Sequence, residues 1–265
     1  MKRKLILILA CLLFLGGLVI MLLPTIRSEM LLQSEHEAIQ LFEQYRNEAQ
    51  ALASPQPAQT SQAETDLQVI ETGRPFPGLW EACQAYNEAL HKEQKYTAYG
   101  MEQPALALSD YGWELETFAT LSIPAAEIEA PVYLGTNRAN LQRGAAVLGG
   151  SSLPIGGEGT HCVICGHRTW HGIIHPFIGL EQVQPGDEVK LTNPWEELTF
   201  QVISVEAAPA DSTDRLLIQS NRDLLTVFTC TYPNDRRVLV TCEREKEERK
   251  SWNPILLPWV AMPSK

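Results

Sequence analysis

Eight short, strand-like segments follow one another from Thr117 onward and set the fold class of this chain. Their residue ranges are 117–124, 130–135, 145–150, 160–168, 187–193, 198–208, 224–230 and 236–245. Gly/Pro turns, such as 154–157 and 185–187, separate the segments. Many short strands with few helices between them are typical of all-β domains. The sequence therefore predicts a mainly β fold, an antiparallel barrel or sandwich, with one helical turn within 211–220.

Residues 5–23, LILILACLLFLGGLVIMLL, form an uncharged apolar run that is long enough to cross a bilayer as a helix. Three cations, Lys2 to Lys4, precede the run, so the positive-inside rule places the N-terminus in the cytoplasm and the rest of the chain outside. A cleaved signal peptide is the alternative. The length of the run and the lack of an A-x-A site after it favour a retained, single-pass anchor in the cell membrane.

Between this anchor and the first strand the sequence alternates helical and loop-like stretches. Residues 28–53 and 79–96 have helical spacing of apolar positions, the segment 54–66 has the composition of a linker, and 97–113 reads as a surface excursion. The proline-interrupted stretch 251–265 is too short to span a membrane. We therefore expect a cytoplasmic tip and anchor (1–27), a helical and linker region with a possible lid (28–113), a β domain (114–248) and a tail (249–265).

Composition excludes some classes of function. The formal net charge is −11, whereas a nucleic-acid-binding domain needs a basic surface, so no nucleic-acid partner is expected. Cys162 and Cys165 form a C-x-x-C without the second ligand pair of a zinc site, and packing in a buried strand is favoured over a metal site or a redox pair. His171 and His175 have a spacing that could hold a metal, but no carboxylate completes the set. We expect no metal and no cofactor.

The stretch 224–242, LLTVFTCTYPNDRRVLVTC, predicts two buried strands joined by a tight connection. Cys230 ends the first strand, and Arg236 and Arg237 begin the second. Cations beside a thiol favour the reactive thiolate. A cysteine at the mouth of a strand, flanked by guanidinium groups, is the pattern of a nucleophile. The turn 232–235 would then form a wall of the substrate groove.

A cysteine nucleophile needs a base or an ion-pair partner, and histidine is the usual one. His167 follows the apolar strand CVIC and precedes a loop, which is the kind of position that Cys230 has. If the two strands are neighbours, both side chains reach one cleft. Arg237, with its fixed fork of donors, could stabilise the oxyanion of a tetrahedral intermediate or hold the substrate carbonyl.

Three stretches resemble the sortases, the membrane-anchored cysteine transpeptidases of Gram-positive bacteria. LPIGGEGTHCVICGHR (153–168) is similar to the family's G-E-G-T-H…G-H-R segment, Thr229-Cys230-Thr231 to its T-C-x, and Arg237 to the arginine before its last apolar strand. The resemblance covers 117–244. It implies an eight-stranded sortase-type β-barrel and the catalytic residues His167, Cys230 and Arg237, with Arg236 as the competitor of Arg237.

The resemblance also implies a peptidase-type thiol chemistry. Cys230 would attack an LPXTG-like sorting signal between Thr and Gly, His167 would protonate the leaving amine, and an amine would resolve the acyl-enzyme. The stretches 131–136 and 141–161 are most similar to class C sortases, which polymerise pilins, so the partners would be LPXTG-like surface or pilin proteins, together with a pilin lysine or a cell-wall precursor.

Two departures leave other sortase roles open. Class C members carry a lid with an Asp-Pro-aromatic motif, whereas this chain has Ser109-Asp110-Tyr111-Gly112-Trp113 without the proline, and no second membrane helix is evident in the tail. A class B-like or housekeeping sortase that anchors proteins to the cell wall is therefore an alternative. Two more distant alternatives are a Cys-His cell-wall hydrolase and a binding module in which His167 and Cys230 are structural residues.

Overall fold

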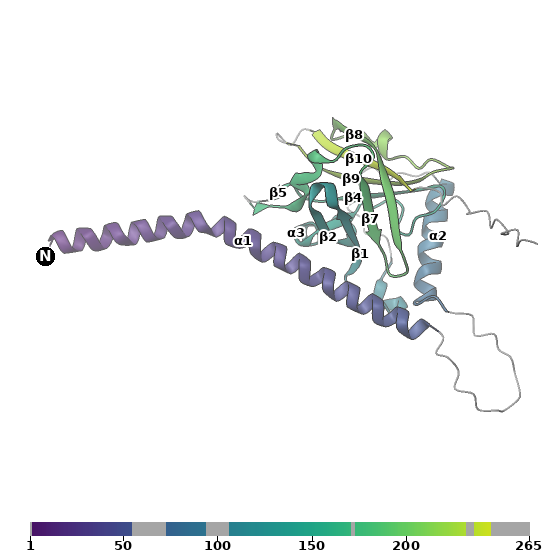
Figure 1. The fold of residues 1–265 in the computed structure, drawn as a ribbon, viewed down its shortest axis with the longest axis horizontal. Coiled ribbons are helices and arrows are strands. Elements are labelled where there is room, and N and C mark those ends of the chain that lie inside the picture. Colours follow the sequence, from purple (N-terminus) through teal and green to yellow (C-terminus); the bar gives the residue numbers. More distant parts are fainter. Residues whose placement is uncertain (1, 55–72, 94–105, 171–172, 232–235, 245–265) are drawn as a thin grey trace, which may run out of the picture.

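A computed structural model of the chain describes residues 2–54, 73–93, 106–170, 173–231 and 236–244 (Figure 1). The helix α1 (Lys2–Ala53) is continuous for 52 residues through Pro24. Its N-terminal half projects beyond the rest of the protein, and its C-terminal half runs alongside the barrel (Figure 1). The apolar side chains of its first half are exposed, and the helix is long and apolar enough to cross a membrane. The expected boundary at residue 27 is therefore not a break in structure.

In the part of the chain that the structure describes, eight strands close into a barrel in the order β1-β2-β3-β4-β9-β10-β8-β7. The strands are β1 (Thr117–Ile123), β2 (Ile128–Leu134), β3 (Ala145–Val147), β4 (Thr160–Cys165), β7 (Glu188–Thr192), β8 (Glu197–Pro209), β9 (Asp223–Cys230) and β10 (Arg236–Arg244). Two further strands, β5 (Thr169–Trp170) and β6 (Ile173–Ile174), form a separate hairpin. The predicted mainly β, eight-stranded barrel is confirmed.

The pairing of the strands corrects one expectation. Among the described strands, β2 pairs with β3 and β4 pairs with β9 in parallel, whereas the sequence pattern predicted an antiparallel barrel. Parallel neighbours need a crossover connection rather than a tight turn. The short helix α3 (Arg138–Arg143) supplies the first crossover, and the chain from β5 to β8 supplies the second. The second crossover places the ends of β4 and β9 side by side.

The barrel interior is a continuous apolar core. Alternate residues of β4, β9 and β10 point into this core, among them Cys162, Leu225 and Val240. The 3-10 helix η3 (Pro176–Gln182) buries Phe177 and Leu180 in the same core. Cys162 faces this interior while Cys165, three residues later on a strand, faces the opposite side. The two thiols therefore do not form a pair.

A second 3-10 helix, η1 (Leu108–Tyr111), leads into Trp113, which joins the N-terminal helices to the barrel. The Trp113 ring lies 5.7 Å from that of Phe42 and 5.1 Å from that of Tyr45, both on α1, and 5.3 Å from that of Phe76 before α2 (Pro77–Glu93). Its indole N–H donates to the carbonyl of Thr117 at 3.1 Å. Trp113 is 1% exposed, so the expected surface excursion is wrong at this residue.

The Trp113 contacts predict a large loss of stability on truncation. We expect Trp113→Ala to lower the free energy of unfolding by about 3–5 kcal/mol, because it removes a fully buried aromatic side chain and leaves a cavity. Tyr111→Ala is the matched control, since this nearby ring is 37% exposed, and its effect should stay below about 1 kcal/mol. Urea denaturation followed by circular dichroism measures both. Equal effects would show that the aromatic cluster does not hold the helices on the barrel.

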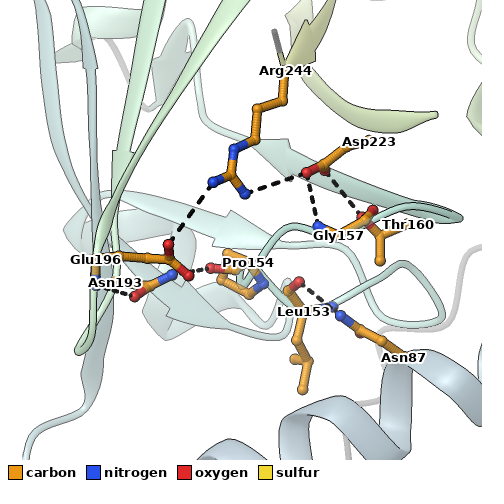
Figure 2. A network of polar contacts seen from close by, with 9 residues as sticks. All are labelled: Asn87, Leu153, Pro154, Gly157, Thr160, Asn193, Glu196, Asp223 and Arg244. Atoms are coloured by element: carbon orange, nitrogen blue, oxygen red, sulfur yellow. Dashed lines mark hydrogen bonds and ion pairs between the residues drawn. The ribbon is translucent and has the colours of Figure 1, made fainter. Parts of the chain in front are cut away.

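A polar network fixes the end of the barrel at which β4 and β9 begin (Figure 2). Asp223 accepts from the backbone N–H of Gly157 at 2.7 Å and from the Thr160 hydroxyl at 3.1 Å, and it pairs with Arg244 at 3.5 Å. Arg244 also pairs with Glu196 at 3.8 Å. Gly157 has a φ of 119°, a backbone conformation that glycine adopts with little steric strain. The G-E-G-T part of the motif is therefore a structural turn at the far end of β4 from His167.

The same network connects the barrel to α2. The side chain of Asn87 donates to the carbonyl of Leu153 at 3.3 Å and accepts from its backbone N–H at 2.7 Å (Figure 2). Nearby, Asn193 donates to the carbonyl of Pro154 at 3.1 Å. These bonds satisfy backbone groups in a buried turn, where an unpaired group would be costly. The loop that leads into β4 is thus held from both sides before the strand starts.

Candidate active site

The parallel pairing of β4 with β9 brings the predicted histidine and cysteine to one end of the barrel. Cys165 lies opposite Phe228, so Gly166 and His167 continue β4 beside the last residues of β9. The backbone N–H of Gly166 donates to the carbonyl of Phe228 at 3.3 Å, and the buried Thr229 hydroxyl donates to the carbonyl of Gly166 at 2.8 Å. These two bonds fix the backbone that precedes His167 against the strand that ends in Cys230.

Antiparallel pairing adds an arginine to the same place. Arg237 of β10 lies directly opposite Cys230 of β9. Side chains at opposite positions of paired strands share a face of the sheet, with Cβ atoms about 5 Å apart. Thr231 directly follows Cys230. Its backbone N–H donates to the carbonyl of Arg236 at 3.1 Å, so the pairing of the two chain segments continues past the cysteine. The register thus places a guanidinium beside the Cys230 thiol.

The cysteine and the arginine lie on the outer face of the barrel. Residues two apart on a strand share a face, so Cys230 lies on the same face as Phe228 and Arg237 on the same face as Leu239. Phe228 and Leu239 belong to a small apolar cluster outside the main core, which also contains Val163, Ala208 and Leu216. Leu216 comes from the 3-10 turn η4 (Thr213–Leu216), where the sequence predicted a helical turn. The candidate site therefore adjoins an apolar strip on the barrel wall.

The two arginines differ in what they contact. Arg236 is exposed, and its guanidinium donates to the carbonyl of Ala207 on β8 at 2.5 Å. Arg237 is half-buried, and its guanidinium donates to the carbonyl of Arg236 at 3.1 Å. Neighbouring residues on a strand face opposite sides, so only Arg237 shares the face of Cys230. The geometry favours Arg237 over Arg236 for a role beside the thiol.

Cys165, which the sequence pattern predicts to be a packing residue, is a third group in this cluster. Its burial raises the pKa of the Cys165 thiol to about 12, with the neighbouring Cys230 adding to the rise and Arg237 opposing it. Cys165 is therefore a neutral thiol at pH 7. Cys230 is a free cysteine on the same face, and in contrast to the buried Cys165 it is only half-buried.

His167 is half-buried and stacks edge-on against His175, with 5.7 Å between ring centroids. Burial lowers the pKa of His167. Burial, and secondarily the charge of His167, lower the pKa of His175 to about 4. Since burial disfavours the charged form, both rings are mainly neutral at pH 7. His175 thus belongs to the surroundings of His167; its suggested metal partner, His171, lies outside the described residues.

The backbone before His167 needs a glycine. A Cβ atom at Gly166 would lie 2.5 Å from the ring of Phe177, a distance that real contacts do not reach. Phe177 is buried in η3, two residues after His175, so the close approach also seats His175 next to His167. The glycine that precedes His167 in the motif thus follows from packing.

The other buried histidine, His161, has a different environment. Its ring nitrogens contact the carbonyl of Leu217 at 3.0 Å and the hydroxyl of Thr226 at 2.8 Å. Both nitrogens are occupied, and the side chain is buried. His161 therefore fastens the loop after η4 to the barrel wall. The described ranges, 2–54, 73–93, 106–170, 173–231 and 236–244, contain no group of three His, Cys, Asp or Glu residues that could hold a metal ion.

Comparison with known proteins decides the family. The sortase domain model matches residues 121–245, which contain the whole site. The solved structure of Streptococcus pneumoniae sortase C is 30% identical, with a TM-score of 0.56 over 64% of this chain and 88% of that one. The chain belongs to the sortase family. Streptococcus agalactiae sortase C1, solved as a complex with MTSET, is 29% identical, with a TM-score of 0.56 over 64% of this chain and 89% of that one.

A curated relative gives a second point of reference within the sortases. Sortase A of Listeria monocytogenes is 26% identical over 133 residues, which make up 49% of this chain and 57% of that protein. The chain thus spans little more than half the length of this relative. The solved structures named above are class C sortases, in agreement with the class C resemblance of the sequence.

The lid expected for a class C sortase has no counterpart in the described part of 97–113. Residues 94–105 lie outside the description, and residues 106–113 lead to Trp113 at the start of β1. Following the strand pairings around the barrel, β1 begins at the end where β9 also begins, whereas Cys230 ends β9. Asp110 therefore lies near the end of the barrel opposite the cysteine. The turn 232–235, expected as a wall of the groove, also lies outside the described residues.

Proposed function

We propose that the chain is a membrane-anchored cysteine transpeptidase that cleaves an LPXTG-like sorting signal between Thr and Gly and transfers the acyl group to an amine. The observation that carries the proposal is the pairing of Cys230 with Arg237 on one face of the barrel, beside the strand end that leads into His167. The family supports it, because sortases are cysteine transpeptidases. The long apolar helix α1 supports the anchor. The three cations before its apolar run support a catalytic domain on the outer side of the cell membrane.

The proposed chemistry uses all three residues. His167, neutral in the resting site, takes the proton of the Cys230 thiol, and the resulting thiolate attacks the threonine carbonyl, so that the negative charge moves to the carbonyl oxygen. The Arg237 guanidinium, on the same face, donates to that oxygen. His167 in its protonated form gives its proton to the glycine nitrogen as the C–N bond breaks, which leaves a thioester on Cys230. An incoming amine then attacks the thioester, loses a proton to the neutral His167, and releases the thiolate.

The apolar strip beside Cys230 offers a binding surface for the donor. Phe228 and Leu239 are neighbours of the catalytic pair on the outer face, and Leu216 of η4 packs against the same cluster. Most of this cluster is already buried, and its partly exposed members are Leu148 and Phe228. A leucine- and proline-containing segment would cover the exposed part of Phe228 while its threonine carbonyl reaches Cys230. The donor would therefore run over β9 and β10 rather than enter the barrel.

Pilin polymerisation is the proposed biological role, with a pilin lysine as the amine. The support is the likeness to the Streptococcus pneumoniae sortase C, a protein with pilin substrate specificity. Anchoring of surface proteins to a cell-wall precursor, as a class B-like or housekeeping sortase, is the alternative. The likeness to Listeria monocytogenes sortase A supports this alternative.

The test separates transfer from hydrolysis. Full-length protein in detergent micelles is incubated with an LPXTG peptide alone, with a lysine-containing peptide, and with a glycine peptide that represents a cell-wall bridge. We expect a new amide product with the lysine peptide at a rate at least tenfold above hydrolysis. Chromatography with mass detection measures both products. Preference for the glycine peptide would favour wall anchoring, and hydrolysis that no amine diverts would support a cell-wall hydrolase instead.

A further inference from the structure

A cavity of about 370 Å³ lies between α1 and the connection of β1 with β2, away from the catalytic pair. Glu35 of α1 lines it and is only 3% exposed, yet its Oε2 atom has no hydrogen-bond partner among the described residues. Glu127, on the β1–β2 connection, and Glu129, on β2, line the same cavity and are exposed. A buried carboxylate oxygen without a partner is costly. Glu35 is thus a buried acidic group for which the described residues supply no partner at Oε2.

The remaining walls of the cavity are largely apolar. Leu32 and Ile39 contribute from α1, Pro124 from the β1–β2 connection, Ile128 from the start of β2, and Pro176 from the start of η3. A lysine side chain has the matching form, since an apolar stem of four carbons ends in an ammonium group. The cavity has no group of three carboxylates or histidines, within the described residues, that could hold a metal ion. Its volume also exceeds that of a single ion and is within the range of small-molecule sites.

The cavity is connected to the candidate active site through η3. Pro176 lines the cavity, and the preceding residue, His175, stacks against the ring of His167. The strand pairings also place the end of β1 at the same end of the barrel as Cys230. A peptide with one side chain in this cavity would therefore lie next to the loop on which His175 meets the catalytic histidine.

We propose that this cavity binds the ammonium group of a lysine side chain of the acceptor protein, with Glu35 as its counter-ion. The inference rests on the proposed transpeptidase function, because it assigns a place to the second substrate. The bound lysine is not the one that reacts: attack on a thioester needs a neutral amine, whereas a carboxylate keeps the ammonium charged. The cavity is thus a docking subsite that selects acceptors with a second lysine.

The charges around Glu35 determine how binding depends on pH. Among the described residues, the titratable groups that face Glu35 are His36 of α1, Glu127 before β2, and Glu129 and Tyr133 of β2. The nearby Arg143 of α3 forms an ion pair with Glu116. Burial raises the pKa of Glu35 to about 8, so the side chain is mainly protonated at pH 7. Binding of a cation requires its deprotonation. Affinity should therefore rise as pH increases from 6 to about 8.5, where a lysine ammonium is still charged.

Two small probes test the subsite without any donor. N-acetyl-lysinamide carries the cation, and N-acetyl-norleucinamide is its neutral analogue. With the full-length chain in detergent micelles at pH 8.5, we expect the lysinamide to bind at least fivefold more tightly, as measured by NMR titration, and Glu35→Gln to remove the difference. Glu37→Gln is the matched control, because Glu37 is exposed on the same helix. The exposed pair Glu127→Gln and Glu129→Gln, which does not put folding at risk, should reduce the preference about twofold.

The outcomes separate the subsite from the proposed function. With an LPXTG donor, Glu35→Gln should raise the KM for a two-lysine acceptor about fivefold and leave donor hydrolysis unchanged. If a thioester forms but both probes bind equally, the subsite is wrong and the function stands. If no thioester forms but the lysinamide binds through Glu35, the function is wrong and the cation site stands. Calcium chloride that binds through Glu35 in place of the lysinamide would overturn the proposal in favour of a metal site.

Discussion

Cys230→Ala is expected to abolish acyl transfer, to below one part in about 10⁵ of the wild-type rate, while the melting temperature stays within about 2 °C. The thiolate forms the only covalent bond to the donor in the proposed mechanism, so no residual route through an acyl-enzyme exists. Cys230 is half-buried at the end of β9 and lies outside the barrel core, so its truncation leaves little cavity. Product formation from an LPXTG peptide and a lysine peptide, followed by chromatography, measures the loss.

Cys165→Ser is the matched control for this prediction. Cys165 lies close to Cys230 on the same outer face, but burial holds its pKa near 12 and keeps its thiol neutral. A neutral buried thiol is a poor nucleophile, so the variant should keep transfer within about tenfold of wild type. Transfer that persists in Cys230→Ala, or that vanishes in Cys165→Ser with the fold intact, would place the nucleophile elsewhere.

Arg237→Ala is expected to lower kcat by about 10²–10³-fold, whereas Arg236→Ala should change it by less than about threefold. A donor that is aimed at the developing oxyanion stabilises the transition state more than the bound substrate, so its loss appears in kcat. Arg237 shares the face of Cys230, and Arg236 is held by the carbonyl of Ala207 on β8. Initial rates over a range of donor concentrations separate kcat from KM for the two variants.

The opposite ranking of the two arginines would contradict this assignment. A third variant, Arg237→Lys, distinguishes charge from geometry. A lysine ammonium keeps the positive charge but lacks the planar fork, so we expect it to recover no more than about tenfold of the lost rate. Full recovery would mean that Arg237 acts only through its charge, for example by favouring the Cys230 thiolate.

Much of the barrel could be predicted from the sequence because its strands are short, apolar and separated by turn residues. The candidate site residues could be proposed for a related reason: His167, Cys230 and Arg237 stand where apolar runs end or begin. Their catalytic roles stay predictions. The parallel pairing of β4 with β9 could not, because periodicity carries no information about which strands are neighbours. It is this pairing that turns two separate strand ends into one site.

The residues that sequence reasoning missed act through tertiary contacts. Trp113 lies in a polar, loop-like stretch, and only its contacts with Phe42, Tyr45 and Phe76 make it a core residue. His175 was considered for a metal site because of its spacing from His171, whereas packing of η3 places it against His167. Glu35 sits in a helix of mixed polarity in which nothing in the local pattern indicates that one glutamate out of several is buried.

The most direct measurement of the central claim is mass spectrometry of the full-length chain after acid quenching of its reaction with an LPXTG peptide. The account predicts a single adduct with the mass of the donor fragment that ends in threonine, located on Cys230 by peptide mapping. It also predicts that a lysine peptide, added before the quench, removes the adduct and appears joined to that fragment. Absence of any adduct, or an adduct on another residue, would contradict the account.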